Sequence, residues 1–127
     1  MQREVGRPLV SGYRDHVRFQ PEGFGAVPLA ATPRLRALVV SLLPGQFLPV
    51  HAPGVDLVAV VLEGEGTAAA GESEVQVGAG SVVVVPAGFD RGFRASTGMV
   101  LLVVVSPPPT EADHAEVARK LREGRWR

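Results

Sequence analysis

Two stretches of the sequence decide the fold: residues 44–66, PGQFLPVHAPGVDLVAVVLEGEG, and residues 80–94, GSVVVVPAGFDRGFR. In both stretches, short runs of valine, leucine and alanine stop at glycine or proline. β-Branched and aliphatic residues favour strands, and glycine and proline mark the turns between them. Each stretch therefore predicts short strands joined by tight turns.

The same pattern continues on either side of these stretches. The predicted strands share an aliphatic run that ends at a turn, and they are Leu35–Leu43, Leu57–Leu62, Thr67–Ala70, Glu74–Val77, Ser81–Val85, Gly92–Ala95 and Met99–Val105. Two of them flank Gly71-Glu72, which is a hairpin pattern. Several short strands separated by turns predict an all-β sandwich or barrel over residues 35–106.

The two ends of the chain have other patterns. Residues 1–34 are broken by glycine and proline, so we expect an N-terminal arm with short strands. Residues 107–127 follow three prolines, and Thr110 stands three residues ahead of Asp113, which predicts a C-terminal α-helix from Glu111 to about Glu123. Trp126 is expected to dock onto the barrel or a partner. A chain of 127 residues has the size of one structural domain.

Composition excludes several classes of function. The chain has no cysteine, which excludes a disulfide scaffold, a thiolate nucleophile and a cysteine metal site. No apolar stretch approaches the roughly 20 residues of a membrane helix, and the N-terminus lacks a secretory apolar region. We therefore expect a cytoplasmic protein without a membrane partner. Residues 51–90 contain six acidic side chains and no lysine or arginine, which disfavours a nucleic-acid partner.

Several motifs together resemble the two conserved boxes of the cupin superfamily, over about residues 40–105. They are Pro44–His51, Val60–Gly66, Gly80, Pro86–Gly88 and Gly92–Arg94, in this order. The resemblance implies a double-stranded β-helix, which is a jelly-roll barrel of the RmlC-like type with a central pocket open at one end.

The resemblance also implies where a metal would bind, through two histidines at alternate positions, a glutamate and a third histidine. The matching positions here hold His51, Pro53, Leu57 and Arg91. Proline and leucine offer no ligating atom, and a guanidinium repels a cation. We therefore expect no metal cofactor, unless a strand bulge turns Asp56 or Asp90 inward as a substitute ligand.

The predicted ligand-binding residues of the pocket are His51, Arg91, Phe47 and Phe93. A buried Arg91 needs either an acidic neighbour such as Asp90 or an anion from solution. His51 is either a hydrogen-bonded wall residue or, when protonated, a second donor to that anion. Phe47 and Phe93 are expected to pack in the core or at the rim.

Three classes of function remain open, and no catalytic residue is assigned. Because three of the four metal-ligand positions lack a ligating side chain, the sequence favours metal-free binding of a small organic molecule. An anionic molecule would suit Arg91 best. The alternative is a small cupin enzyme: an isomerase or epimerase with His51 as general base, or a metalloenzyme with substitute ligands. A purely structural or dimerisation module is the third class. Exposed sheet edges and the irregular arm predict a homodimer.

Overall fold

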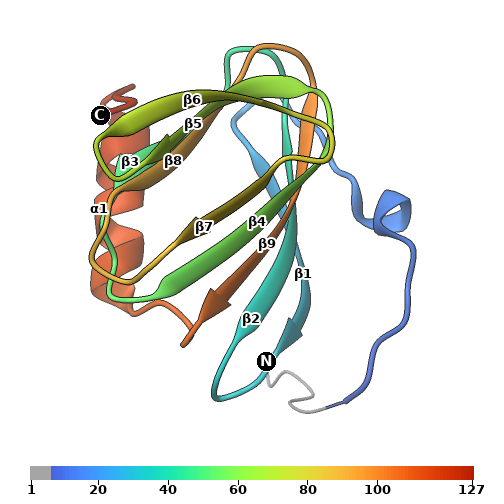
Figure 1. Ribbon diagram of the computed structural model, residues 1–127. Helices are drawn as coiled ribbons and strands as arrows, with labels where there is room; N and C mark the ends of the chain where they lie inside the picture. Colours follow the sequence, from blue (N-terminus) through green and yellow to red (C-terminus); the bar gives the residue numbers. More distant parts are fainter. Residues whose placement is uncertain (1–6) are drawn as a thin grey trace.

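Two antiparallel β-sheets face each other, and a single long helix packs beside them (Figure 1). This computed structural model describes residues 7–127, so residues 1–6 of the expected arm lie outside the described residues. The strands are β1 Gly25–Ala31, β2 Arg36–Leu42, β3 Phe47–His51, β4 Asp56–Glu63, β5 Glu65–Ala70, β6 Ser73–Gly78, β7 Val82–Val85, β8 Arg91–Ala95 and β9 Met99–Ser106. A 3-10 turn, η1, covers Tyr13–His16, and helix α1 covers Glu111–Arg122.

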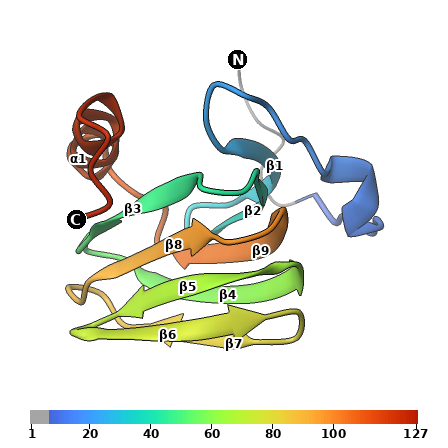
Figure 2. The ribbon, with the colours of Figure 1, turned by 90° about the horizontal axis from the view of Figure 1, so that it is seen from above.

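The strand order confirms the predicted jelly roll. One sheet runs β1-β2-β9-β4-β7 and the other β3-β8-β5-β6 (Figure 2). Gly64, in the turn from the first sheet to the second, has φ +84, and a side chain there would overlap the Gly98 carbonyl. Only glycine meets both conditions. The strands predicted from aliphatic runs agree with the observed ones to within about two residues, because the turn signals fix where each run ends.

The core lies between the sheets. Successive side chains of a strand point to opposite faces, so every second residue of β4 faces the other sheet. Leu57, Ala59 and Val61 are accordingly buried, and Phe93 of β8 and Leu101 of β9 meet them in the same cluster.

Strand β1 corrects the expectation for the N-terminal region. The sequence pattern places Gly25–Ala31 in the arm, yet this segment pairs with β2 as a full strand of the five-stranded sheet. The proline at position 28 disfavours a strand because it cannot donate a hydrogen bond. Here the register shifts between Pro28 and Ala30, and β1 is an edge strand, so the missing donor is tolerated.

The C-terminal helix confirms the capping prediction. The Thr110 side chain accepts a hydrogen bond from the Asp113 backbone N–H, and the Asp113 carboxylate accepts one from the Thr110 backbone N–H. This reciprocal pair satisfies two N–H groups that a helix start would otherwise leave free. The helix ends at Arg122, one residue before the predicted end.

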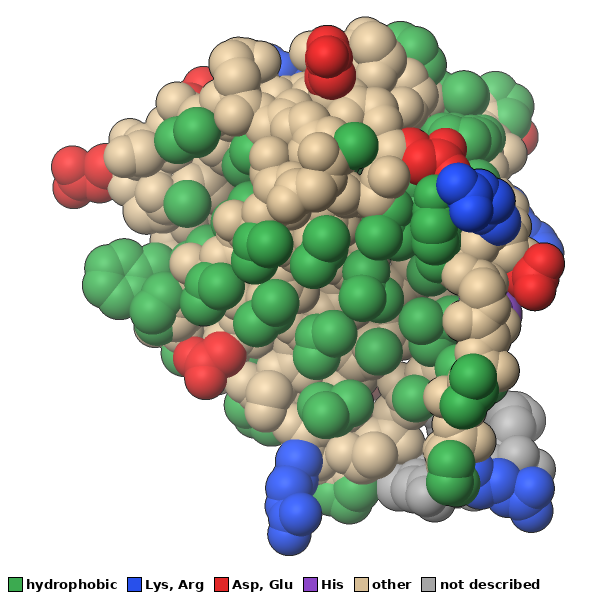
Figure 3. Space-filling view, turned by 45° about the vertical axis from the view of Figure 1, so that its right-hand side comes forward, with side chains coloured by type: hydrophobic (Ala, Val, Ile, Leu, Met, Phe, Trp, Pro, Cys, Tyr) green, Lys and Arg blue, Asp and Glu red, His purple; other side chains and the backbone are tan. Residues whose placement is uncertain are grey.

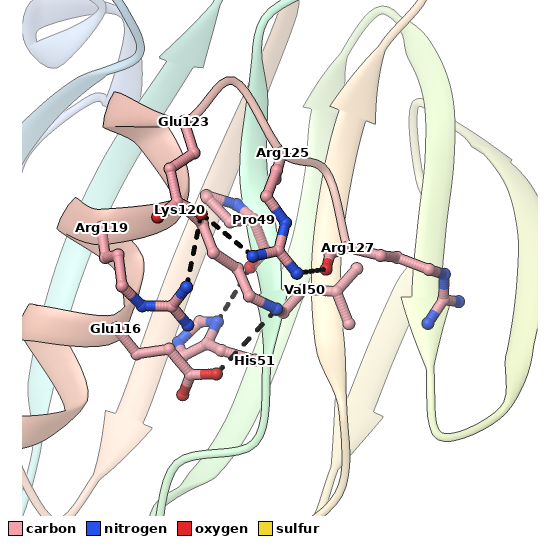
Figure 4. Close-up of polar contacts among 9 residues, drawn as sticks. All are labelled: Pro49, Val50, His51, Glu116, Arg119, Lys120, Glu123, Arg125 and Arg127. Atoms are coloured by element: carbon pink, nitrogen blue, oxygen red, sulfur yellow. Dashed lines mark hydrogen bonds and ion pairs between the residues drawn. The ribbon is translucent and has the colours of Figure 1, made fainter.

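Residues 120–127 cover the free edge of β3. Lys120 Nζ donates to the Val50 carbonyl at 2.6 Å, and the Val50 N–H donates to the Trp126 carbonyl at 2.7 Å. Figure 4 shows Lys120 reaching from the helix to the strand. The Trp126 ring packs edge-on against Phe47, with centroids 6.3 Å apart, so it docks onto the barrel. Within residues 7–127, no helix is long and apolar enough to cross a membrane.

Candidate ligand-binding site

A cavity of about 340 Å³ lies between the two sheets and is closed on one side by α1. Its wall is mostly apolar, with inward-facing residues from both sheets and from the helix. The apolar lining residues include Leu38, Val40, Leu57, Phe93, Val103, Val105, Val117 and Leu121. A largely apolar cavity of this size with a few polar groups is typical of small-molecule sites, which hold about 300–1,000 Å³.

All titratable side chains in the lining are basic. They are Arg36 on β2, His51 on β3, Arg91 on β8 and His114 on α1. No aspartate or glutamate lines this cavity among the residues that the structure describes. In a wall of low polarity, unbalanced positive charge favours an anion over a cation or a neutral molecule.

Arg91 is the most deeply buried of these basic groups, at 3% exposed. Its Nη2 atom donates to the Pro86 carbonyl at 3.0 Å, and Nε donates to the Phe89 carbonyl at 3.4 Å. The third nitrogen, Nη1, is buried and has no hydrogen-bond partner among residues 7–127. A buried polar atom without a partner is rare and costs stability, so this nitrogen marks a place where an acceptor is missing.

No carboxylate pairs with Arg91 within residues 7–127. The prediction left open whether Asp90 neutralises it, but no ion pair joins the two side chains. Asp56 accepts a hydrogen bond from the Ala87 backbone N–H at 2.8 Å and lies outside the cavity lining. Burial lowers the pKa of Arg91, and the charges of Asp56 and Asp113 only partly oppose this effect.

His51 stands opposite Arg91 in the register of β3 and β8. Its Nδ1 lies 2.9 Å from the Pro49 carbonyl (Figure 4), so Nδ1 carries the proton and Nε2 of the neutral ring is an acceptor. Burial lowers the pKa of His51 below 6.5; the bond to Pro49 raises it, and the charge of Arg91 lowers it further. The free imidazole is therefore neutral at pH 7.

The two phenylalanines predicted as pocket residues have different positions relative to the cavity. Phe93 lines the cavity and is 1% exposed. Phe47 does not belong to the lining, and its prediction as a pocket residue is corrected: it pairs with Arg94 on the outer face and packs against Trp126. Leu48, the next residue of β3, lines the cavity instead, and neighbouring residues of a strand point to opposite faces.

Arg36 and His114 were not predicted as site residues. Arg36 lies in β2 two residues before Leu38, which also lines the cavity. Because residues two apart in a strand share a face, this spacing could have predicted that Arg36 faces the cavity. His114 enters the site only because α1 packs across the opening, and nothing in its local sequence indicates this contact.

The residues present do not fit the metal that the cupin fold implies. Of the four ligand positions, only His51 carries a donor, and Arg91 places a cation where a histidine would bind. Residues 7–127 contain no group of three or more His, Cys, Asp or Glu residues that could hold a metal ion. Neither Asp56 nor Asp90 lines the cavity, so the bulge that would turn one of them inward is not observed.

Comparison with known proteins identifies the family. No protein-family model and no curated protein match the sequence. Among solved structures, TT1209 from Thermus thermophilus is 33% identical, with 77% of this chain and 96% of that chain covered and a TM-score of 0.72. An RmlC-like cupin from Desulfovibrio desulfuricans is 30% identical, with 80% and 99% covered and a TM-score of 0.72.

The two facing antiparallel sheets define a double-stranded β-helix protein. With these two relatives, the chain belongs to the RmlC-like cupins. KdgF from Halomonas sp. shares the fold at 20% identity, with 72% of this chain and 86% of that chain covered and a TM-score of 0.66.

Proposed function

We propose that this cupin binds a small organic anion, most simply a carboxylate, in its barrel through Arg91 and without a metal. The observation that carries the proposal is the buried Nη1 atom of Arg91, which has no acceptor in the described part of the chain. A carboxylate supplies that acceptor, and charge-assisted hydrogen bonds to a guanidinium are among the strongest in proteins. The mostly apolar wall would hold the rest of the ligand.

His51 supports the same ligand. The neutral ring offers Nε2 as an acceptor for a hydroxyl of the ligand, and a protonated ring would donate to the anion instead. A bound anion favours the imidazolium form and raises the pKa of His51, so binding takes up a proton. Affinity should therefore increase as the pH falls, in the range just above the lowered pKa of the free histidine.

A catalytic alternative has one favourable observation. A neutral His51 with a free Nε2 has the protonation state of a general base at pH 7. Isomerases and epimerases also need a second group that returns the proton, and the described lining offers no carboxylate for this role. Binding without turnover therefore agrees better than catalysis with the titratable residues that line the cavity.

Isothermal titration calorimetry with matched ligand pairs tests the proposal. Small aliphatic and aromatic carboxylates are each compared with the corresponding carboxamide, and sugar phosphates are included. We expect saturable binding of carboxylates, no binding of carboxamides, and an affinity loss of about 10- to 150-fold in Arg91→Gln, since such bonds contribute about 1.5–3 kcal/mol.

Two controls make this result specific to the site. Arg94 lies on the same strand but on the outer face, so Arg94→Gln should bind like the wild type. The difference between pH 6 and pH 8 should disappear in His51→Gln. Equal affinity of wild type and Arg91→Gln for every ligand, or tighter binding of the carboxamides, would show that Arg91 does not hold an anion.

A further inference from the structure

The four basic side chains that line the cavity gather at one end of the barrel, here called the basic end. They are Arg36, the first residue of β2, His51, the last of β3, Arg91, the first of β8, and His114, in the first turn of α1. The positive charge is therefore concentrated at one end of the cavity instead of being spread over its wall.

Strand register brings these four positions together. Arg36 pairs with Val105 near the end of β9, and the other neighbour of Val105 lies near the start of β4. Residues 52–55 lead from His51 to the start of β4, and His51 pairs with Arg91 in the second sheet. A short segment also leads from the end of β9 into α1, so the first turn of the helix lies at the same end.

Away from the basic end, the same four elements line the cavity with apolar side chains. These are Leu38 and Val40 on β2, Leu48 on β3, Phe93 on β8, and Val117 and Leu121 on α1. Each element thus supplies a basic group at one end and apolar groups along the rest of the wall. A ligand that matches this cavity has an acidic head and an apolar tail.

The position of Arg36 is the opposite of what solvation alone favours. The outer face of the five-stranded sheet is mainly hydrophobic, and its Lys and Arg side chains lie toward the margins (Figure 3). Arg36 shares the inner face of β2 with Leu38, where a charge is costly unless it has a partner. A charge on the inner face of a sheet whose outer face is apolar indicates a role in the cavity.

Arg36 has no charged partner within the described part of the chain. It is partly buried, and its guanidinium forms no hydrogen bond or ion pair with residues 7–127. Two acidic side chains at the basic end, Asp56 and Asp113, accept hydrogen bonds from the backbone N–H groups of Ala87 and Thr110 instead. Neither acid lines the cavity, so Arg36 is available to an anion.

We propose that the ligand is an amphiphilic dianion: Arg91 holds its first acidic group, Arg36 holds the second, and its apolar tail extends along Leu48 and Phe93. This inference rests on the proposed function, because it requires an anion at Arg91. Packed sheets lie about 10 Å apart, so long arginine side chains from the two inner faces can contact one small head group. A dicarboxylate or a phosphate monoester with an aliphatic or aromatic substituent has this chemistry.

Isothermal titration calorimetry at pH 7 with three probes that share a butyl tail tests the second acidic group. Pentanoate carries one carboxylate, butylsuccinate carries two, and butyl phosphate carries a phosphate monoester. We expect the wild type to bind at least one of the dianions about tenfold more tightly than pentanoate, because one further charge-assisted contact contributes about this factor. The dianion that binds more tightly identifies the head group.

Three variants assign the contacts. Arg36→Gln should lower the affinity for that dianion about tenfold and leave pentanoate binding unchanged. The matched control is Arg34→Gln, because Arg34 is exposed in the loop before β2 and lies outside the cavity lining, so this variant should bind like the wild type. Arg91→Gln should weaken the binding of all three probes. In the wild type, a pentyl tail in place of butyl should raise the affinity about fourfold.

The outcomes separate this inference from the proposed function. Pentanoate binding that depends on Arg91, together with dianions that bind no more tightly than pentanoate, would overturn the dianion and leave the anion site at Arg91 intact. An equal loss in Arg34→Gln and Arg36→Gln would overturn the role of Arg36. Failure of every probe to bind, or equal binding by Arg91→Gln and the wild type, would overturn the proposed function itself. The ligand comparison uses the wild type, so it decides the question even if Arg36→Gln does not fold.

Discussion

Arg91 is a buried cation whose guanidinium has two carbonyl acceptors and one nitrogen without a partner. Its charge is permanent under physiological conditions, so the ligand-free protein keeps a desolvated charge in its core. Groups that destabilise the free protein and serve ligand binding are expected at functional sites. Stability and binding should therefore change in opposite directions when this residue is replaced.

We expect Arg91→Met to raise the free energy of unfolding of the ligand-free protein by about 1–2 kcal/mol while it abolishes anion binding. Methionine fills a similar volume without charge, although the Pro86 and Phe89 carbonyls lose their donor. Urea unfolding measures the change. Arg94→Met is the control, and it should lower the free energy of unfolding by about 0.5–1 kcal/mol. The reason is that the Arg94 guanidinium lies over the Trp126 ring at 5.0 Å, and methionine removes this cation–π contact. A less stable Arg91→Met would mean that the carbonyl contacts outweigh the burial of the charge.

At the scale of elements, α1 both closes the cavity and protects the edge of β3. Val117 and Leu121 line the cavity, while Lys120, on another side of the helix, donates to the Val50 carbonyl. Lys120 is 9% exposed, and its ion pair with Glu116 is long at 3.9 Å. The bond to Val50 is therefore the main polar contact that fixes the helix on the strand.

We expect Lys120→Met to lower the free energy of unfolding by about 1.5–3 kcal/mol, since methionine keeps the apolar stem and removes the charged donor. Amide hydrogen exchange should accelerate in α1 and β3 and stay unchanged in β9. Arg119→Met is the matched control, because within residues 7–127 the ion pair of Arg119 is with Glu123 at the surface, and its loss should change stability by less than about 0.5 kcal/mol. Uniform acceleration over both sheets would contradict a local role for Lys120.

Elements differ in how well their sequences specify them. Helix α1 follows from the Thr110–Asp113 pair, and β7 from four valines before a proline, because in both cases the deciding interactions are local. The sequence predicted short strands in residues 1–34 but not that β1 joins the five-stranded sheet, since its partner β2 and the bulge at Pro28 decide that placement. In the site, the positions of Arg91 and Phe93 could be predicted from the spacing of the sequence motifs. The outward direction of Phe47 could not, because the sequence does not specify which face of β3 turns toward the cavity. The place of His114 could not either, because it depends on tertiary packing.

At the scale of the whole molecule, the site differs from a metal-dependent barrel in its charge. Two arginines, Arg36 and Arg91, line the described cavity together with His51 and His114. A divalent cation would bind there against the charge of the arginines. A metal that stabilised the fold would do so by its binding free energy, which a chelator would remove.

We therefore expect no change in the melting temperature on treatment with excess EDTA, and carboxylate binding of the same affinity before and after. Elemental analysis of protein purified without an affinity tag should find manganese, iron, nickel and zinc far below one per chain. Near-unit content of any of them, or a melting temperature lowered by several degrees in EDTA, would refute metal-free binding.

The position of β9 has a consequence for the order in which the chain is synthesised. It is the central strand of its sheet, with β2 on one side and β4 on the other, yet it is the last strand of the barrel to leave the ribosome. Until then, the β1–β2 hairpin and the β4–β7 pair present open edges that cannot join each other. The sheet can therefore close only at the end of barrel synthesis, and we expect a nascent chain that ends before Met99 to expose unpaired strand edges that favour aggregation.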